Sequence, residues 1–168
     1  MSQPLARNEE AGAIASRVEH KPESGYLPLM LRLYLIRHAE PLSTWGGGEP
    51  DPGLSPKGRT QAEAARDALL ALPEALRPTA VVSSPLRRCR ETAQPFADAI
   101  GASVTIDPSV GEIPAPSGLS DEEKGPWLRN AFEGRWGEIE GDIDYLEWRR
   151  SVAEALARHR GAAVFSHY

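Results

Sequence analysis

Three short segments of the sequence each place arginine, histidine or serine side chains directly after an apolar, strand-like run. The run LRLYLIRHAE ends on Arg37 and His38, VVSSPLRRCRETA spans 81–93, and AAVFSHY spans 162–168. In open α/β sheets, ligands bind outside the carboxyl ends of the strands. We therefore expect the three segments to meet in one pocket whose side chains can handle a phosphate group.

The joint pattern is more informative than any of its parts. The dipeptide Arg37-His38 alone says little, because a histidine at a strand end is more often structural than catalytic. Taken together, RHAE, SSPLRRCRETA, a mid-chain glutamate and the final SH resemble the histidine phosphatase superfamily, whose fold is phosphoglycerate mutase-like. The resemblance covers about residues 30–168.

Phosphoryl transfer requires an in-line nucleophile, fixed positive charge and a proton for the leaving group. Imidazole can act as a covalent nucleophile, and the resemblance gives that role to His38, through a phosphohistidine that water then hydrolyses. Nearby cations help to keep His38 neutral, since like charge disfavours protonation. The resemblance makes Arg37 and Arg88 the phosphate-binding residues, and the planar guanidinium fork suits that task. Arg87 and Arg90 are interpreted as part of a solvated helix face.

Two further residues complete the site that the resemblance implies. Glu112 in DPSVGEI corresponds to the family's proton donor. The alternative interpretation is that Glu112 is an ordinary solvent-exposed glutamate, one among many. His167 corresponds to the second family histidine, which hydrogen-bonds the transferring phosphoryl group. Glu40 is a weaker candidate, for orienting the loop or His38. Ser83 and Ser84 are candidates for a supporting role.

The chain departs from the family pattern at three places. Ala39 stands where the family usually has glycine, and Tyr168 where it usually has a small residue. The family continues with a further helix beyond the second histidine, so we expect 30–168 to be a histidine phosphatase domain without its usual C-terminal end. Residues 1–29 carry no secretory core and end in the linker-like KPESGYLP, which predicts a mobile N-terminal extension.

The elements alternate in the manner of an α/β fold, and the resemblance implies a three-layer sandwich with a mostly parallel central sheet flanked by helices. Strands are expected at 31–37, 79–84, 102–106 and 162–166. The first is apolar at nearly every position, as expected of a strand covered on both faces. Helix starts are predicted at Ser55-Pro56, at Ser84-Pro85, at Ser120 with a capping box to Glu123, and at Asp142.

Composition limits the classes of function. The chain has 168 residues, 40% hydrophobic and 26% charged, which suits one domain with one core. A net charge of −5 without a basic block argues against nucleic-acid binding, and no apolar run approaches a membrane span. Cys89 is the only cysteine, which favours a reducing cytosol. Neither metal-ligand spacing nor a phosphate-binding glycine loop is present, so we expect no cofactor.

Three hypotheses for the function remain open. The first is a phosphomonoesterase that acts through a phosphohistidine on a small phosphorylated metabolite. The second is a phosphoglycerate mutase-type phosphotransferase, and the third is a non-catalytic fragment that binds a phosphate ligand. The expected partner is the small phosphorylated substrate, with neither nucleic acid nor membrane involved. The sequence leaves the oligomeric state open, a homodimer included.

Overall fold

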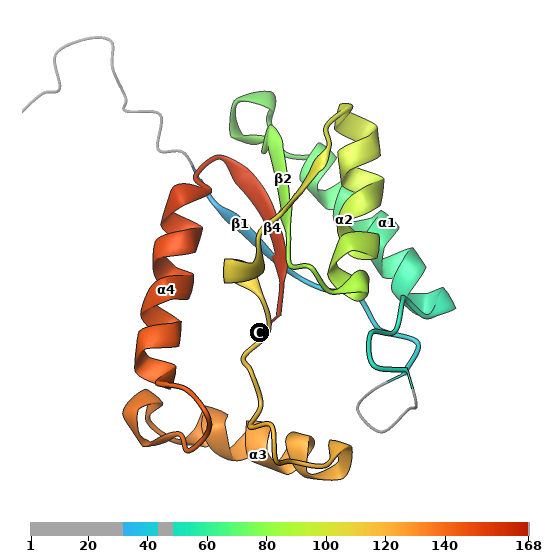
Figure 1. Ribbon diagram of the computed structural model, residues 1–168. Helices are drawn as coiled ribbons and strands as arrows, with labels where there is room; N and C mark the ends of the chain where they lie inside the picture. The colour runs from blue at the N-terminus through green and yellow to red at the C-terminus, as the bar shows by residue number, and fades with distance from the viewer. Residues whose placement is uncertain (1–31, 44–48, 168) are drawn as a thin grey trace, which may run out of the picture. The chain divides into compact units, whose positions relative to one another are not determined.

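Figure 1 shows the computed structural model, which describes residues 32–43 and 49–167. The expected extension at 1–29 and the departure at Tyr168 lie outside the described residues. The elements in chain order are β1 (Tyr34–Arg37), α1 (Pro56–Leu70), β2 (Ala80–Ser83), α2 (Arg87–Ile100), β3 (Val104–Ile106), α3 (Asp121–Glu133), α4 (Tyr145–Arg158) and β4 (Ala162–Ser166). Three short 3-10 turns lie at Glu74–Leu76, Pro108–Val110 and Trp136–Glu138.

The strands form one parallel sheet in the order β1-β4-β2-β3, which confirms the predicted α/β class. β4 pairs with β1 on one side and with β2 on the other. The register sets Arg37 of β1 opposite Ser166 of β4, and Ser83 of β2 opposite Phe165. The three segments that were expected to meet therefore end side by side at the carboxyl edge of the sheet.

Alternate residues of the central strands pack against helices on opposite faces of the sheet. Val81 and Phe165 belong to an apolar cluster with Phe96 of α2, whereas Val82 and Val164 belong to a second cluster with α4. Figure 1 shows α1 and α2 on one side of the sheet and α4 on the other. Burial on both faces explains why AAVFS is apolar without alternation.

β1 differs from its prediction in length and in burial. It is confined to Tyr34–Arg37 and lies at the edge of the described part of the sheet. Tyr34 and Ile36 pack against the α1–α2 cluster, but Leu35 on the other face is 43% exposed. Leu33, just before β1, packs against the α4 cluster, so the predicted cover on both faces holds at Leu33 but not at Leu35.

Two of the predicted helix starts are confirmed by their hydrogen bonds. Ser55 caps α1, and its hydroxyl accepts from the Gly58 amide at 2.9 Å. At α3, the Ser120 side chain accepts from the backbone and the Glu123 carboxylate accepts from the Ser120 amide at 2.8 Å, which is the predicted capping box. Local side-chain-to-backbone bonds are readable from sequence because both partners lie within one turn.

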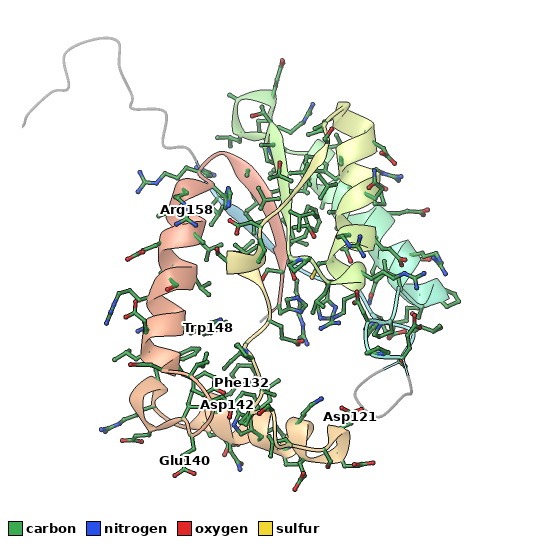
Figure 2. All side chains as sticks on the ribbon, viewed as in Figure 1. Asp121, Phe132, Glu140, Asp142, Trp148 and Arg158 are labelled. Atoms are coloured by element: carbon green, nitrogen blue, oxygen red, sulfur yellow. The ribbon has the colours of Figure 1, made fainter. Side chains whose placement is uncertain are left out.

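The other two starts are each wrong by two residues. α2 begins at Arg87, with Leu86 as its N-cap. The Ser84 hydroxyl does not cap this helix and lies 3.0 Å from His167 Nε2. α4 is capped by Asp144, while Asp142, labelled in Figure 2, accepts from the Ser117 amide at 2.6 Å. In both cases the sequence motif competes with a long-range partner that the local pattern does not show.

Among the described residues, no helix is long and apolar enough to cross a membrane.

Candidate active site

His38 follows β1 directly, and its backbone amide donates to the Ser166 carbonyl of β4 at 2.9 Å. Its Nδ1 lies 2.8 Å from the Ala39 carbonyl oxygen. A carbonyl can only accept, so Nδ1 carries the proton and Nε2 keeps its lone pair. Burial lowers the pKa of His38 most, and the charges of Arg88 and Arg37 lower it further, against the raising effect of the Ala39 carbonyl. The imidazole is therefore neutral, with one nitrogen available as a nucleophile.

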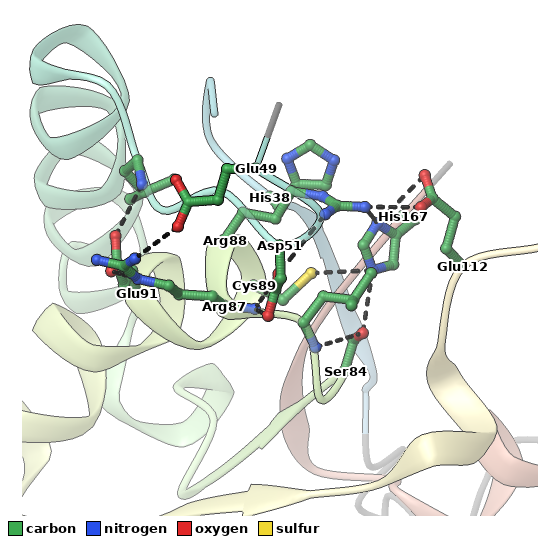
Figure 3. A network of polar contacts seen from close by, with 12 residues as sticks. His38, Glu49, Asp51, Ser84, Arg87, Arg88, Cys89, Glu91, Glu112 and His167 are labelled. Atoms are coloured by element: carbon green, nitrogen blue, oxygen red, sulfur yellow. Dashed lines mark hydrogen bonds and ion pairs between the residues drawn. The ribbon is translucent and has the colours of Figure 1, made fainter. Parts of the chain in front are cut away.

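Arg88 on the first turn of α2 is the buried cation of the site, only 8% exposed. Its Nη2 lies 2.6 Å from Glu112 Oε2, and its Nη1 lies 3.9 Å from Asp51 Oδ1. Figure 3 shows the guanidinium beside the rings of His38 and His167. A buried guanidinium at the carboxyl edge of the sheet can bind two phosphate oxygens at once.

Arg37 and Arg87 have different surroundings. Arg37 is exposed at the end of β1, lines the same pocket as His38, and makes no ion pair with any residue in 32–43 or 49–167. Arg87 is half-exposed and pairs with Glu91 at 2.6 Å and with Glu49 at 3.3 Å. The structure thus separates Arg87 from Arg88 although they are neighbours in sequence, because successive helical residues do not share a face.

Glu112 and His167 reach the same position from different elements. Glu112 follows the 3-10 turn Pro108–Val110, and its Oε1 lies 3.7 Å from His167 Nδ1. The His167 ring follows β4 and lies 5.0 Å from the His38 ring, centroid to centroid. Burial, followed by the charges of Arg88, His38 and Arg37, lowers the pKa of His167 to about 3. His167 is therefore neutral as well.

The site opens into a cavity of about 460 Å³. Its lining combines phosphate-handling side chains with apolar and charged ones: Arg37, His38, Pro41, Ser43, Glu49, Pro50, Pro52, Leu86, Arg88, Glu112, Asp121, Lys124 and Leu128. This volume lies within the ~300–1,000 Å³ that is usual for small-molecule sites. The described residues contain no group of three or more metal-ligating side chains.

The three residues predicted to support the site, Glu40, Ser83 and Ser84, differ in what they contact. Glu40 does not contact the His38 ring, and its carboxylate accepts from Ser55 Oγ and Lys57 Nζ, both at 2.8 Å, so it ties the loop to the start of α1. The Ser83 hydroxyl donates to the Ser84 carbonyl. Only Ser84 of the three touches a ring of the site, that of His167.

Sequence reasoning missed several residues that the structure places at the site, among them Asp51, Cys89 and the cavity-lining Lys124. Asp51 accepts from the Arg87 amide at 2.8 and 3.0 Å, which caps α2 from a distant loop. Cys89 Sγ lies 3.2 Å from His167 Nε2. Asp51 had no local signal, since its partner lies 36 residues away. Cys89 directly follows Arg88 in the motif SSPLRRCRETA, and this position next to a predicted site residue was the feature of the sequence that could have indicated it.

Known proteins resemble the chain in sequence and in structure. "Probable phosphoglycerate mutase GpmB" of Enterobacter sp. (strain 638) is 33% identical over 62% of this chain and 51% of its own length. The chain therefore spans about half the length of this relative. Among solved structures, mycobacterial glucosyl-3-phosphoglycerate phosphatase Rv2419c is 26% identical, with a TM-score of 0.58, over 80% of this chain and 73% of that one.

A second solved structure is phosphoserine phosphatase from Entamoeba histolytica, in complex with 3-phosphoglyceric acid. It is 26% identical, with a TM-score of 0.59, over 81% of this chain and 73% of that one. The sequence model of the histidine phosphatase superfamily (branch 1) matches residues 33–167, which include both histidines, both arginines and the glutamate of the site. By fold, by site and by this match, the chain belongs to the histidine phosphatase superfamily, branch 1.

Proposed function

We propose that the chain is a phosphomonoesterase that transfers a phosphoryl group to Nε2 of His38 and then to water. The observation that carries the proposal is the hydrogen bond from His38 Nδ1 to the Ala39 carbonyl, which leaves Nε2 unprotonated beside two arginines. The phosphorus–oxygen bond of the ester breaks as the nitrogen–phosphorus bond forms, and hydrolysis of that bond regenerates the histidine.

The remaining side chains have distinct roles in this proposal. Arg37, Arg88 and His167 hold the phosphoryl oxygens, and Glu112 protonates the leaving oxygen. In the structure, Arg88 binds the Glu112 carboxylate at 2.6 Å. Substrate phosphate offers Arg88 a doubly charged acceptor in place of that carboxylate, so phosphate binding would release Glu112. The released carboxylate would take up a proton from water and pass it to the leaving oxygen.

The substrate that we propose is a small phosphorylated metabolite. The cavity of about 460 Å³ gives room for an organic group beside the phosphate, and its prolines and leucines offer that group an apolar surface. The names of the solved relatives support this class, since they are phosphatases of glucosyl-3-phosphoglycerate and of phosphoserine. The free, buried Cys89 supports a location in a reducing cytosol.

Release of inorganic phosphate tests the proposal. The full chain should release phosphate from nitrophenyl phosphate and, faster, from at least one member of a panel of phosphorylated hydroxy acids, sugars and amino acids. His38→Gln should release none from any of them. Binding of these compounds without phosphate release from any member would instead indicate a non-catalytic phosphate-binding protein.

A mutase-type phosphotransferase is the second candidate, and the name of the Enterobacter relative favours it. Such an enzyme returns the phosphoryl group to an organic hydroxyl before water attacks. Phosphoglycerate labelled in its phosphate distinguishes the two reactions. Label that moves between the two hydroxyl positions faster than it appears as free phosphate would favour the transferase, and the reverse order would favour the esterase.

A further inference from the structure

Helix α3 presents one face to α4 and another to the cavity. On the first face, the Trp127 ring lies 5.8 Å from the Tyr145 ring of α4, centroid to centroid. Asp121, Lys124 and Leu128 line the cavity, and their spacing of three and four residues places them on one side of the helix. Figure 2 labels Asp121 at the start of α3. The cavity is therefore bounded by α3 as well as by the strand ends.

Lys124 brings a positive charge to this side of the cavity. Its Nζ donates to Asp121 Oδ1 at 2.7 Å, and within the described ranges Lys124 makes no other ion pair. An ammonium group has three N–H donors, so this pair leaves donors for a ligand. The Lys124 side chain is 30% exposed, against 52% for Asp121. Partial burial makes its attraction for an anion stronger than that of a fully exposed lysine.

The other charged groups of the lining already have a partner or a proposed task. Arg37 and Arg88 bind phosphate in the proposed function. Glu112 binds Arg88 at 2.6 Å, and Glu49 binds Arg87 at 3.3 Å. A cationic substrate group would have to compete with these arginines for the carboxylates. The lining therefore favours an anionic substituent on the organic part of the substrate over a cationic one.

We propose that Lys124 is a specificity-determining residue that binds a carboxylate of the substrate, which makes the substrate class phosphorylated hydroxy acids. The inference rests on the proposed function, in which Arg37 and Arg88 hold the phosphate end. Leu128, one turn after Lys124, and Leu86 line the same cavity and offer the carbon skeleton an apolar surface. A carboxylate suits Lys124 better than a hydroxyl does, because charge-assisted hydrogen bonds are roughly twice as strong as neutral ones.

Two matched esters test the proposal. Phosphoglycerate esterified at its terminal hydroxyl and terminal glycerol phosphate share one carbon skeleton, and they differ in a carboxylate against a hydroxymethyl group. The full chain should hydrolyse the acid with a kcat/KM at least about tenfold higher, as expected from one charge-assisted hydrogen bond. Equal kcat/KM values for the two esters would overturn the proposal, because Lys124 would then not distinguish a carboxylate from a neutral group.

The double variant Asp121→Asn/Lys124→Met tests whether Lys124 makes the difference. It removes both charges of the pair, so the net charge is unchanged and no unpaired carboxylate remains to repel the acid. The two esters should then react with kcat/KM values within about twofold of each other, since the charge-assisted bond is gone. Retained hydrolysis of glycerol phosphate shows that the variant is folded. A preference for the acid that persists would assign the carboxylate contact to another cation.

Two single variants are the controls. Asp121→Asn keeps Lys124 and removes the carboxylate that competes for it, so the preference for the acid should be retained or increased. Arg129→Met removes a cation from an exposed position of the same helix, outside the cavity lining, and should leave the preference unchanged. Loss of the preference in Arg129→Met would show that the general charge of α3, rather than a contact with Lys124, produces it. Its loss in Asp121→Asn would assign the preference to Asp121.

Binding separates this inference from the proposed function. In a His38→Gln background neither ester should be hydrolysed, and calorimetry measures both dissociation constants. Phosphoglycerate should bind at least about tenfold more tightly than glycerol phosphate, and the double variant of Asp121 and Lys124 in this background should remove the difference. If the native chain releases no phosphate but this difference is found, the proposed function fails and the contact with Lys124 stands. Equal affinities would overturn the contact even in a chain that releases phosphate.

Discussion

The environment of His38 gives its ring the properties that the proposed nucleophile needs. A hydrogen bond to the Ala39 carbonyl selects the tautomer, and burial together with two arginines keeps the ring neutral. The same carbonyl bond alone would raise the pKa of the ring, so burial and positive charge outweigh it. The site therefore depends on the balance of these effects at one residue.

This balance predicts where the ring of His38 takes up a proton. Because its pKa is lowered, His38 should stay neutral below pH 6.5, the ordinary value, and lose nucleophilicity only as the pH falls further. Titration of the full chain by nuclear magnetic resonance measures the midpoint without interference from the substrate's own ionisation. Arg37→Gln removes one of the two cations and should move the midpoint upward. A native midpoint at or above pH 6.5 would contradict this account.

The two neighbouring arginines should respond differently to the same change. Arg88→Lys preserves the charge but removes the planar fork at a position only 8% exposed, so kcat/KM should fall by at least about tenfold. Arg87→Lys lies outside the cavity lining, and its activity should stay within about twofold of native. Unfolding in urea checks that both variants are folded. Equal losses of kcat/KM in two folded variants would show that the phosphate contact has been assigned to the wrong arginine.

Glu112 is tested by the nature of the leaving group. Glu112→Gln cannot supply a proton, so esters of weakly acidic alcohols should react at least about a hundredfold more slowly. Nitrophenyl phosphate should be slowed far less, because its leaving group needs little protonation. The comparison of kcat for the two ester types is the measurement. A similar slowing of both types would make Glu112 a residue that holds Arg88 in place rather than the acid.

At the scale of elements, the start of α1 supports the loop that follows His38. Glu40 accepts from Ser55 and Lys57 through its side chain, and its backbone carbonyl lies against Gly58. A methyl group at Gly58 would overlap that carbonyl oxygen. The loop after His38 and the first turn of α1 are therefore packed too closely for any side chain at this position.

Substitution of Gly58 tests this contact. Gly58→Ala should destabilise the chain by roughly 2–4 kcal/mol, since backbone must shift on one side or the other. Gly125→Ala in α3 is the matched control, because its new methyl group would meet only Arg129, at 3.8 Å. Alanine is the better helix former, so Gly125→Ala should be neutral or stabilising by up to about 1 kcal/mol. Urea unfolding measures both, and equal effects would argue against the close packing at Gly58.

The elements also show what could be predicted from sequence. The caps at Ser55 and Ser120 were predicted because each bonds an amide within its own first turn. The cap expected at Ser84 was wrong because the hydroxyl faces His167, which lies 83 residues away in sequence. Asp142 and Asp144 are both helix-capping residue types, and only the bond of Asp142 to Ser117 separates them. Local patterns predict local bonds and fail where a distant partner decides.

At the scale of the molecule, the parallel sheet gathers the site. Its order β1-β4-β2-β3 brings the ends of three strands together, as the three motifs predicted. The position of Arg88 between Glu112 and His167 could not be read from sequence, because it depends on how α2 and the loop after β3 pack above the sheet. The motifs were enough to predict which residues form the site, whereas the contacts between those residues depend on the fold.

The central claim is that His38 carries the phosphoryl group, and trapping the intermediate tests it most directly. The full chain is mixed with nitrophenyl phosphate, quenched in alkali within one turnover and digested for mass spectrometry. Phosphate should be found on His38, disappear on brief acid treatment and be absent from His38→Ala. His159→Ala, which removes a histidine outside the cavity lining, should retain it. Acid-stable phosphate on Ser83 or Ser84, or turnover by His38→Ala, would contradict the account.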